Sequence, residues 1–141
     1  MASKKMLIAA SLQLFDIITR LLFTDDKKER DLATLTKLAL VQNRDTLAGD
    51  ILLFKQDLAS IKEELGISSE VVENLTPEQN EQFEERLKKA LARVVEHTFV
   101  PVSREDLKYI NDIQFTAEDL SLIAATLLES EEVVKESFSQ E

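Results

Sequence analysis

Side chains that could carry out chemistry are scarce in this chain of 141 residues. It has one histidine, His97, and no cysteine or tryptophan. Thiolate catalysis, disulfides and cysteine-type zinc sites are therefore excluded, and hydrolytic zinc sites require several histidines or cysteines. A Ser–His–Asp triad is formally possible, but the sequence contains no nucleophile elbow. We expect His97 to cap the end of a helix or to face solvent.

Carboxylates are numerous, but their spacing does not predict a metal site. No EF-hand calcium loop is present. Di-iron bundles need a Glu three residues before each ligating histidine, whereas Val94 occupies that position before His97. Gly49 and Gly66 are the only glycines and cannot form a phosphate-binding loop. We therefore expect no enzyme activity, no cofactor and no metal.

The net charge of −10 is distributed unevenly. Residues 1–70 carry 11 acidic and 10 basic side chains, whereas residues 71–141 carry 16 and 7. This balance argues against direct binding of nucleic acid or of an anionic membrane, because both need clustered cations. Solubility is one interpretation, and a protein partner with a basic surface is the other. The candidate acidic surface consists of Glu118, Asp119, Glu129, Glu131, Glu132 and Glu136.

The shortage of glycine and proline predicts an all-α fold, a compact bundle of four to five main helices. The first helix, over Ser3–Phe23, is very apolar and should lie at the centre of the bundle. Gln13, Asp16 and Arg20 interrupt this stretch, so it is not expected to be a signal peptide or a membrane span. We expect a cytoplasmic protein with one domain over residues 1–129 and a frayed acidic tail over 130–141.

The remaining helices are predicted from caps and from apolar residues at helical spacing. A second helix follows the cap cluster at residues 24–26 and reaches about Gln42. Its inner side is predicted to carry Leu32, Leu35, Leu38 and Ala39. Residues 43–46 are either a joint or continuous helix, and a third helix over Thr46–Leu65 ends at Gly66. A fourth helix starts with a capping box of Thr76 and Gln79 and reaches about His97. After an extended connector, short helices start at Ser103 and Thr116.

The third predicted helix carries an apolar seam with heptad spacing. The seam residues are Leu47, Ile51, Phe54, Leu58, Ile61 and Leu65. Acidic Asp50 and Asp57 flank one side and basic Lys55 and Lys62 the other, which suits a parallel homodimer. The alternative is a helix that packs within its own chain. Leu52, Leu53 and Ala59 widen the apolar surface and favour that alternative.

Taken together, these patterns favour a non-enzymatic protein–protein interaction module, such as an adaptor, regulatory or assembly subunit. The seam and the apolar first helix predict self-association through helices, with a dimer as the favoured state. Two alternatives stay open. One is an acidic inhibitor or immunity-type protein that blocks a basic surface of a partner, for example one that binds nucleic acid. The other is a helical carrier of an apolar ligand.

Overall fold

The computed structural model describes residues 3–66, 75–107, 110 and 112–128, which form a mostly helical structure with one small sheet. The elements in chain order are β1 (Ser3–Leu7), α1 (Ile8–Leu22), α2 (Thr34–Glu64), α3 (Pro77–Leu91), β2 (Val94–Thr98), α4 (Arg104–Leu107) and α5 (Ala117–Thr126). The predicted helical character is confirmed. The prediction that the fold is purely α-helical is wrong, because β1 and β2 pair with each other.

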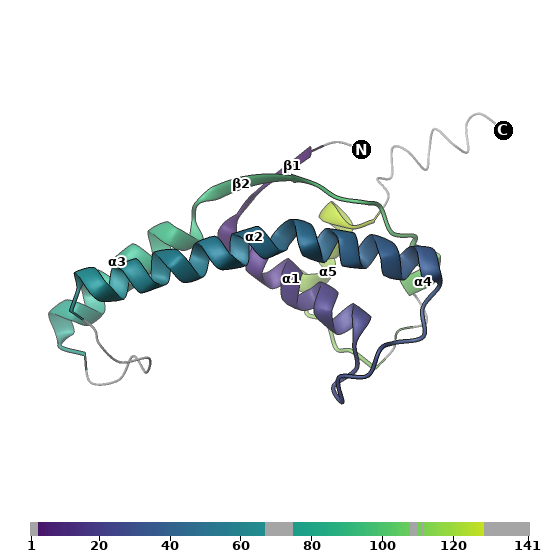
Figure 1. Ribbon diagram of the computed structural model, residues 1–141, viewed down its shortest axis with the longest axis horizontal. Coiled ribbons are helices and arrows are strands. Elements are labelled where there is room, and N and C mark those ends of the chain that lie inside the picture. The colour runs from purple at the N-terminus through teal and green to yellow at the C-terminus, as the bar shows by residue number, and fades with distance from the viewer. Residues whose placement is uncertain (1–2, 67–74, 108–109, 111, 129–141) are drawn as a thin grey trace.

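Helix α2 is the longest of these elements and sets the shape of the molecule (Figure 1). Its 31 residues extend about 46 Å at the usual rise per residue. Helix α1 packs against both α2 and α5, whereas α3 runs back along the C-terminal half of α2 (Figure 1). Strand β1 leads into α1, and β2 leads from α3 toward α4 (Figure 1).

The sheet shortens two of the predicted helices. Strand β1 pairs antiparallel with β2, from Ser3 opposite Thr98 to Leu7 opposite Val94. The first helix therefore begins at Ile8 rather than Ser3, and the fourth ends at Leu91 rather than near His97. The consecutive β-branched residues Val94 and Val95 favour a strand, and Lys5 lies directly opposite Glu96 in the pair. These contacts join distant parts of the sequence, so helical periodicity does not reveal them.

Residues 34–64 form one continuous helix, so the joint considered at residues 43–46 does not exist. The helix begins later than predicted, because residues 24–33 form a turn and an extended segment. In this turn Lys27 has a positive φ of 62°, and Phe23 forms a β-bridge with Glu29. Gly49 lies within the helix, and a Cβ atom built there would meet no other atom within 4 Å.

Replacing Gly49 with alanine should stabilise the protein. The backbone at this position is helical and the added methyl group meets open space, so the free energy of unfolding should rise by about 1 kcal/mol. Urea denaturation of dilute protein measures the change. The exposed neighbour Ala48 provides the matched control, because Ala48→Gly should lower stability by a similar amount. A destabilised Gly49→Ala variant would contradict this account.

Three predicted start and stop signals are confirmed, whereas the cap cluster at residues 24–26 is followed by a turn and an extended segment instead of a helix. Thr76 and Gln79 form the predicted capping box before α3, with Pro77 at the first helical position. Thr116 and Asp119 form a second capping box before α5. Gly66 has a φ of 71° just beyond α2, as the predicted left-handed cap requires.

The core is centred on α1, which buries Ile8, Ser11, Leu14, Ile17, Ile18, Leu21 and Leu22. Leu40 and Leu47 from α2, Val102, and Leu127 after α5 complete this core. The apolar first helix is therefore surrounded by its own chain, as predicted from its composition. Two residues predicted to lie inward do not, since Leu35 is 80% exposed and Leu38 is 51% exposed. Leu120 of the last helix is also exposed.

A row of polar contacts, here called the polar ladder, fastens the segment 86–106 along α2. The ladder residues on α2 are spaced seven apart: Thr36, Asn43, Asp50, Asp57 and Glu64. Their partners are Asp106, Val100, His97, Arg93 and Arg86, in that order. A seven-residue step returns to nearly the same helix face with a drift of about 20°. The segment 86–106 thus runs antiparallel to α2 along one side of the helix, over most of the length of α2.

Asn43 makes the most complete contact of the polar ladder. Its amide nitrogen donates to the Val100 carbonyl at 2.9 Å, and its amide oxygen accepts from the Val100 N–H at 2.7 Å. The residue is only 1% exposed, so both bonds are shielded from water. The Asn43 amide thus satisfies both backbone polar groups of Val100, as a neighbouring strand would do in a sheet.

Replacing Asn43 with alanine should destabilise the protein by about 2–3 kcal/mol, because both polar groups of Val100 lose their partner. Chemical denaturation measures the change. Gln42→Ala, at the exposed neighbouring position, is the matched control and should change stability by less than about 0.5 kcal/mol. Equal effects for the two variants would contradict the role of the bidentate contact.

Candidate functional site

The residues of the predicted seam lie on the inner side of α2. Leu47 is fully buried and Ile61 is 8% exposed. The other four, Ile51, Phe54, Leu58 and Leu65, are half-buried. This placement is the one expected for a helix that packs against α1 and α3 of its own chain. Self-association through the seam stays a prediction, and it would have to compete with these intramolecular contacts.

The charges that flank the seam have different surroundings. Asp50 and Asp57 belong to the polar ladder and contact His97 and Arg93 of the same chain. Lys55 is exposed and Lys62 is half-buried, and neither forms an ion pair within the described part of the chain. Since Asp50 is bound within its own chain, it is not free to pair with Lys55 of a second copy.

The single histidine was placed incorrectly by sequence reasoning. His97 lies in β2 rather than at a helix end, and its Nε2 atom is 2.5 Å from Oδ2 of Asp50. The two side chains are only 16% and 10% exposed. The recurrence of polar residues every seven positions along the otherwise apolar inner side of α2 was the signal that could have located this contact. Within the described residues, no group of three or more His, Asp or Glu side chains is arranged to hold a metal.

The predicted acidic surface is only partly within the described residues. Glu118 is exposed near the start of α5. Asp119 is half-buried and accepts hydrogen bonds from Gln13 of α1 and from the Thr116 N–H. The bond from Gln13, aided by the backbone of Thr116, lowers the pKa of Asp119. Glu129, Glu131, Glu132 and Glu136 lie outside the described residues.

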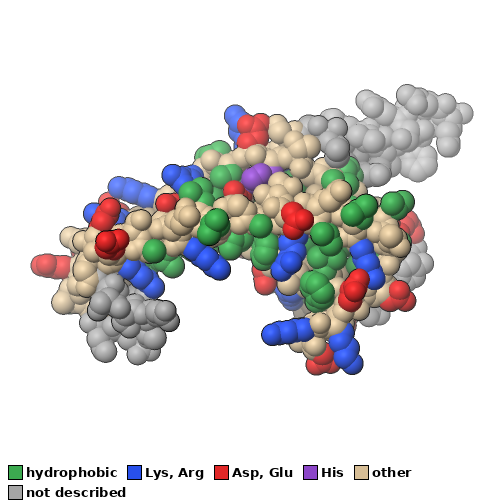
Figure 2. All heavy atoms as spheres, in the orientation of Figure 1, with side chains coloured by type: hydrophobic (Ala, Val, Ile, Leu, Met, Phe, Trp, Pro, Cys, Tyr) green, Lys and Arg blue, Asp and Glu red, His purple; other side chains and the backbone are tan. Residues whose placement is uncertain are grey.

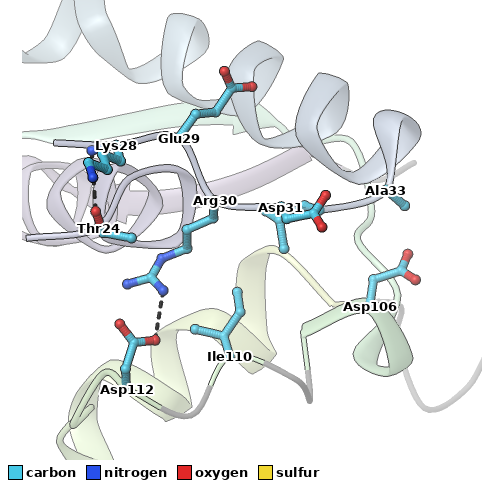
Figure 3. A pocket seen from close by; sticks show the side chains of 10 residues that line it. Thr24, Lys28, Glu29, Arg30, Asp31, Ala33, Asp106, Ile110 and Asp112 are labelled. Carbon is cyan, nitrogen blue, oxygen red and sulfur yellow. Dashed lines mark hydrogen bonds and ion pairs between the residues drawn. The ribbon is translucent and has the colours of Figure 1, made fainter. Parts of the chain in front are cut away.

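An open groove of about 550 Å³ lies between the loop at residues 24–33 and the segment that follows α4 (Figure 3). Arg30 crosses this groove, donating from Nη1 to Asp112 at 2.7 Å and from Nε to the Arg20 carbonyl at 2.8 Å. Arg30 is 10% exposed and Asp112 is 57% exposed. The hydrogen bond from Arg30 lowers the pKa of Asp112. The charges of Arg30 and Asp112 in this groove are therefore paired with each other.

The Arg30–Asp112 pair should make stability depend on pH in acid. Because the pKa of Asp112 is lower when folded than when unfolded, its stabilising contribution is complete above the unfolded-state pKa. That contribution is lost as the pH falls through the folded-state pKa. Asp112→Asn should therefore lower stability at neutral pH, by a modest amount because the carboxylate is exposed, and have a smaller effect at about pH 2.

Denaturation of both proteins at the two pH values measures this difference. Asp25→Asn, an exposed acid in the 24–33 loop, is the matched control and should equal the parent protein at both pH values. A stability difference for Asp112→Asn that persists unchanged in strong acid would contradict the assignment.

A smaller apolar groove of about 280 Å³ lies between α1, α4 and α5. Its lining residues include Leu21, Leu107, Phe115 and Ile123, with Arg104 beside them. This volume is slightly below the range of about 300–1,000 Å³ found for small-molecule sites. The groove therefore offers little support for the predicted carrier of an apolar ligand.

The opposite side of α2 carries exposed apolar residues. Leu38 was predicted to lie on an inner side, and Leu52 and Ala59 to widen the seam, but these residues were not grouped into one outward stripe. This outer face consists of Leu38, Val41, Asp45, Ala48, Leu52, Lys55 and Ala59, all of which are exposed. Leu38, Val41 and Leu52 keep 51%, 42% and 59% of their surface accessible. Hydrophobic side chains recur along α2 in Figure 2, with charged side chains between them. A row of large apolar residues in water is the feature of this structure that best fits a protein interface.

Comparison with protein-family models, with curated proteins and with solved structures gave no match. None of the described helices is both long enough and apolar enough to span a membrane.

Proposed function

We propose that this chain is a non-enzymatic protein–protein interaction module that associates with itself through α2, with a dimer as the favoured state. The observation that carries the proposal is the outer face of α2, where large apolar side chains are exposed although the chain has folded around the other side. Burying this face against a protein would remove apolar surface from water without disturbing the core.

The sequence supports the non-enzymatic part of the proposal. One histidine and no cysteine leave few groups that could act as nucleophile or general base. The histidine also has a structural partner, because it contacts Asp50 between β2 and α2. A cytoplasmic location is part of the same proposal and rests on the cysteine-free composition, which suits a reducing compartment.

Sedimentation velocity over a range of concentrations tests the self-association. The outer face is short, so we expect a dissociation constant on the order of tens of micromolar. Leu52→Lys should raise this constant at least about tenfold while circular dichroism and thermal unfolding stay unchanged, because Leu52 is exposed in the monomer. A parent protein that stays strictly monomeric at hundreds of micromolar would remove self-association from the proposal.

A double variant tests the predicted seam separately. Ile51→Lys with Leu58→Lys should unfold the protein, because both side chains pack on the inner side of α2. Circular dichroism and sedimentation follow the two properties together. Folded monomers from this variant would instead identify the seam as the self-association surface and contradict the assignment to the outer face.

A further inference from the structure

We infer that the outer faces of two α2 helices pack antiparallel about a twofold axis level with residue 50, so that the partner of this face is a second copy of the chain. This inference rests on the proposed self-association and specifies its geometry. Three features of the outer face support this geometry: the spacing of its residues, the signs of two unpaired charges and the sizes of its apolar side chains.

The outer face has the spacing of a helix–helix seam. Its seven positions, from Leu38 to Ala59, are separated alternately by three and four residues. This pattern keeps one stripe of an α-helix facing a second helix over about six turns. All seven side chains are exposed, so no rearrangement of the monomer is needed before a second helix can approach.

Two charges on the outer face select the orientation of the two helices. Asp45 and Lys55 are exposed, and neither forms an ion pair among the described residues. A parallel pair would place Asp45 beside Asp45 of the second copy and Lys55 beside Lys55, which opposes association. With an axis level with residue 50, an antiparallel pair places Asp45 beside Lys55 of the second copy. Twofold symmetry repeats this contact, so both charges of both copies are neutralised.

The apolar residues are complementary in size in the same arrangement. Leu52 lies level with Ala48 of the second copy, and Val41 lies level with Ala59. These two layers of the interface therefore each combine one larger and one smaller side chain, which allows interdigitation. A parallel pair would instead place Leu52 against Leu52 and Ala48 against Ala48.

Gly49 lies beside the centre of this interface. A Cβ atom at this position would meet nothing within 4 Å, so packing inside the monomer gives no reason for glycine in the middle of a 31-residue helix. Close approach of a second helix gives such a reason, because a missing side chain lets two backbones come near each other. This observation is independent of the charge pattern and agrees with it.

A charge-reversal cycle tests the orientation in the full chain. Asp45→Lys and Lys55→Asp should each raise the dissociation constant of the dimer about tenfold, because each variant places like charges side by side. The double variant should return to within about threefold of the parent. Glu81→Lys, at an exposed position of α3, is the control for net charge and should leave the constant unchanged. A parallel dimer would respond to none of these reversals, because like charges face each other in every variant.

Cysteine cross-linking gives a second readout, made clean by the absence of natural cysteines. In the antiparallel pair, two copies of Asp45→Cys are offset by about 15 Å along the axis, beyond the reach of a disulfide. Under mild oxidation, Asp45→Cys alone and Lys55→Cys alone should therefore stay uncross-linked. A mixture of the two should form the mixed disulfide, which intact-mass spectrometry identifies.

The outcomes separate this inference from the proposed function. Efficient self-cross-linking of Asp45→Cys would establish a parallel pair and overturn the inference. A dimer that ignores both the charge reversals and the cysteine pairs would overturn the inference and leave self-association standing. A strictly monomeric parent protein would overturn both.

Discussion

The polar ladder is the constraint on which the rest of the structure depends. It fixes where the segment after α3 lies on α2, and that segment carries β2, the only strand paired with β1 in the described chain. Sliding the segment by one residue would separate every contact of the ladder. Asn43 and Asp50 would then be buried without partners, each at a cost of about 1–3 kcal/mol. The register of the segment is therefore set by polar groups, while its affinity for the helix comes from apolar packing.

The two sides of helix α2 have different surroundings. Its inner side holds the ladder and the half-buried seam, which together connect α1, α3 and β2. On its outer side, Leu38 and Leu52 stay exposed to water. Large apolar residues lie on both sides of α2, and within the described residues the chain covers only the inner side. Association through the outer side is compatible with the fold because it uses none of the contacts that hold the monomer together.

Most signals confined to a few neighbouring residues were predictable, and those that depend on distant partners were not. The cap cluster at residues 24–26 is an exception, because no helix starts there. Thr76 with Gln79, Thr116 with Asp119, and Gly66 act within one helical turn, so the sequence near each one sufficed. Strand β1 was predicted as helix because its pairing partner lies more than 85 residues away. The exposure of Leu38 could not be anticipated either. Apolar residues lie on both sides of α2, and periodicity alone does not tell which side the chain covers.

The pairing of β1 with β2 has a consequence for how the protein matures on the ribosome. Ser3–Leu7 is made before its partner Val94–Thr98, which follows only after α1, α2 and α3. At the usual rates of synthesis the N-terminal strand waits several seconds with an open hydrogen-bonding edge. Lys4 and Lys5 are exposed on this strand, and such charges on an unpaired edge hinder pairing with other chains. Two positive charges are therefore present on this segment throughout the interval before its partner strand is made.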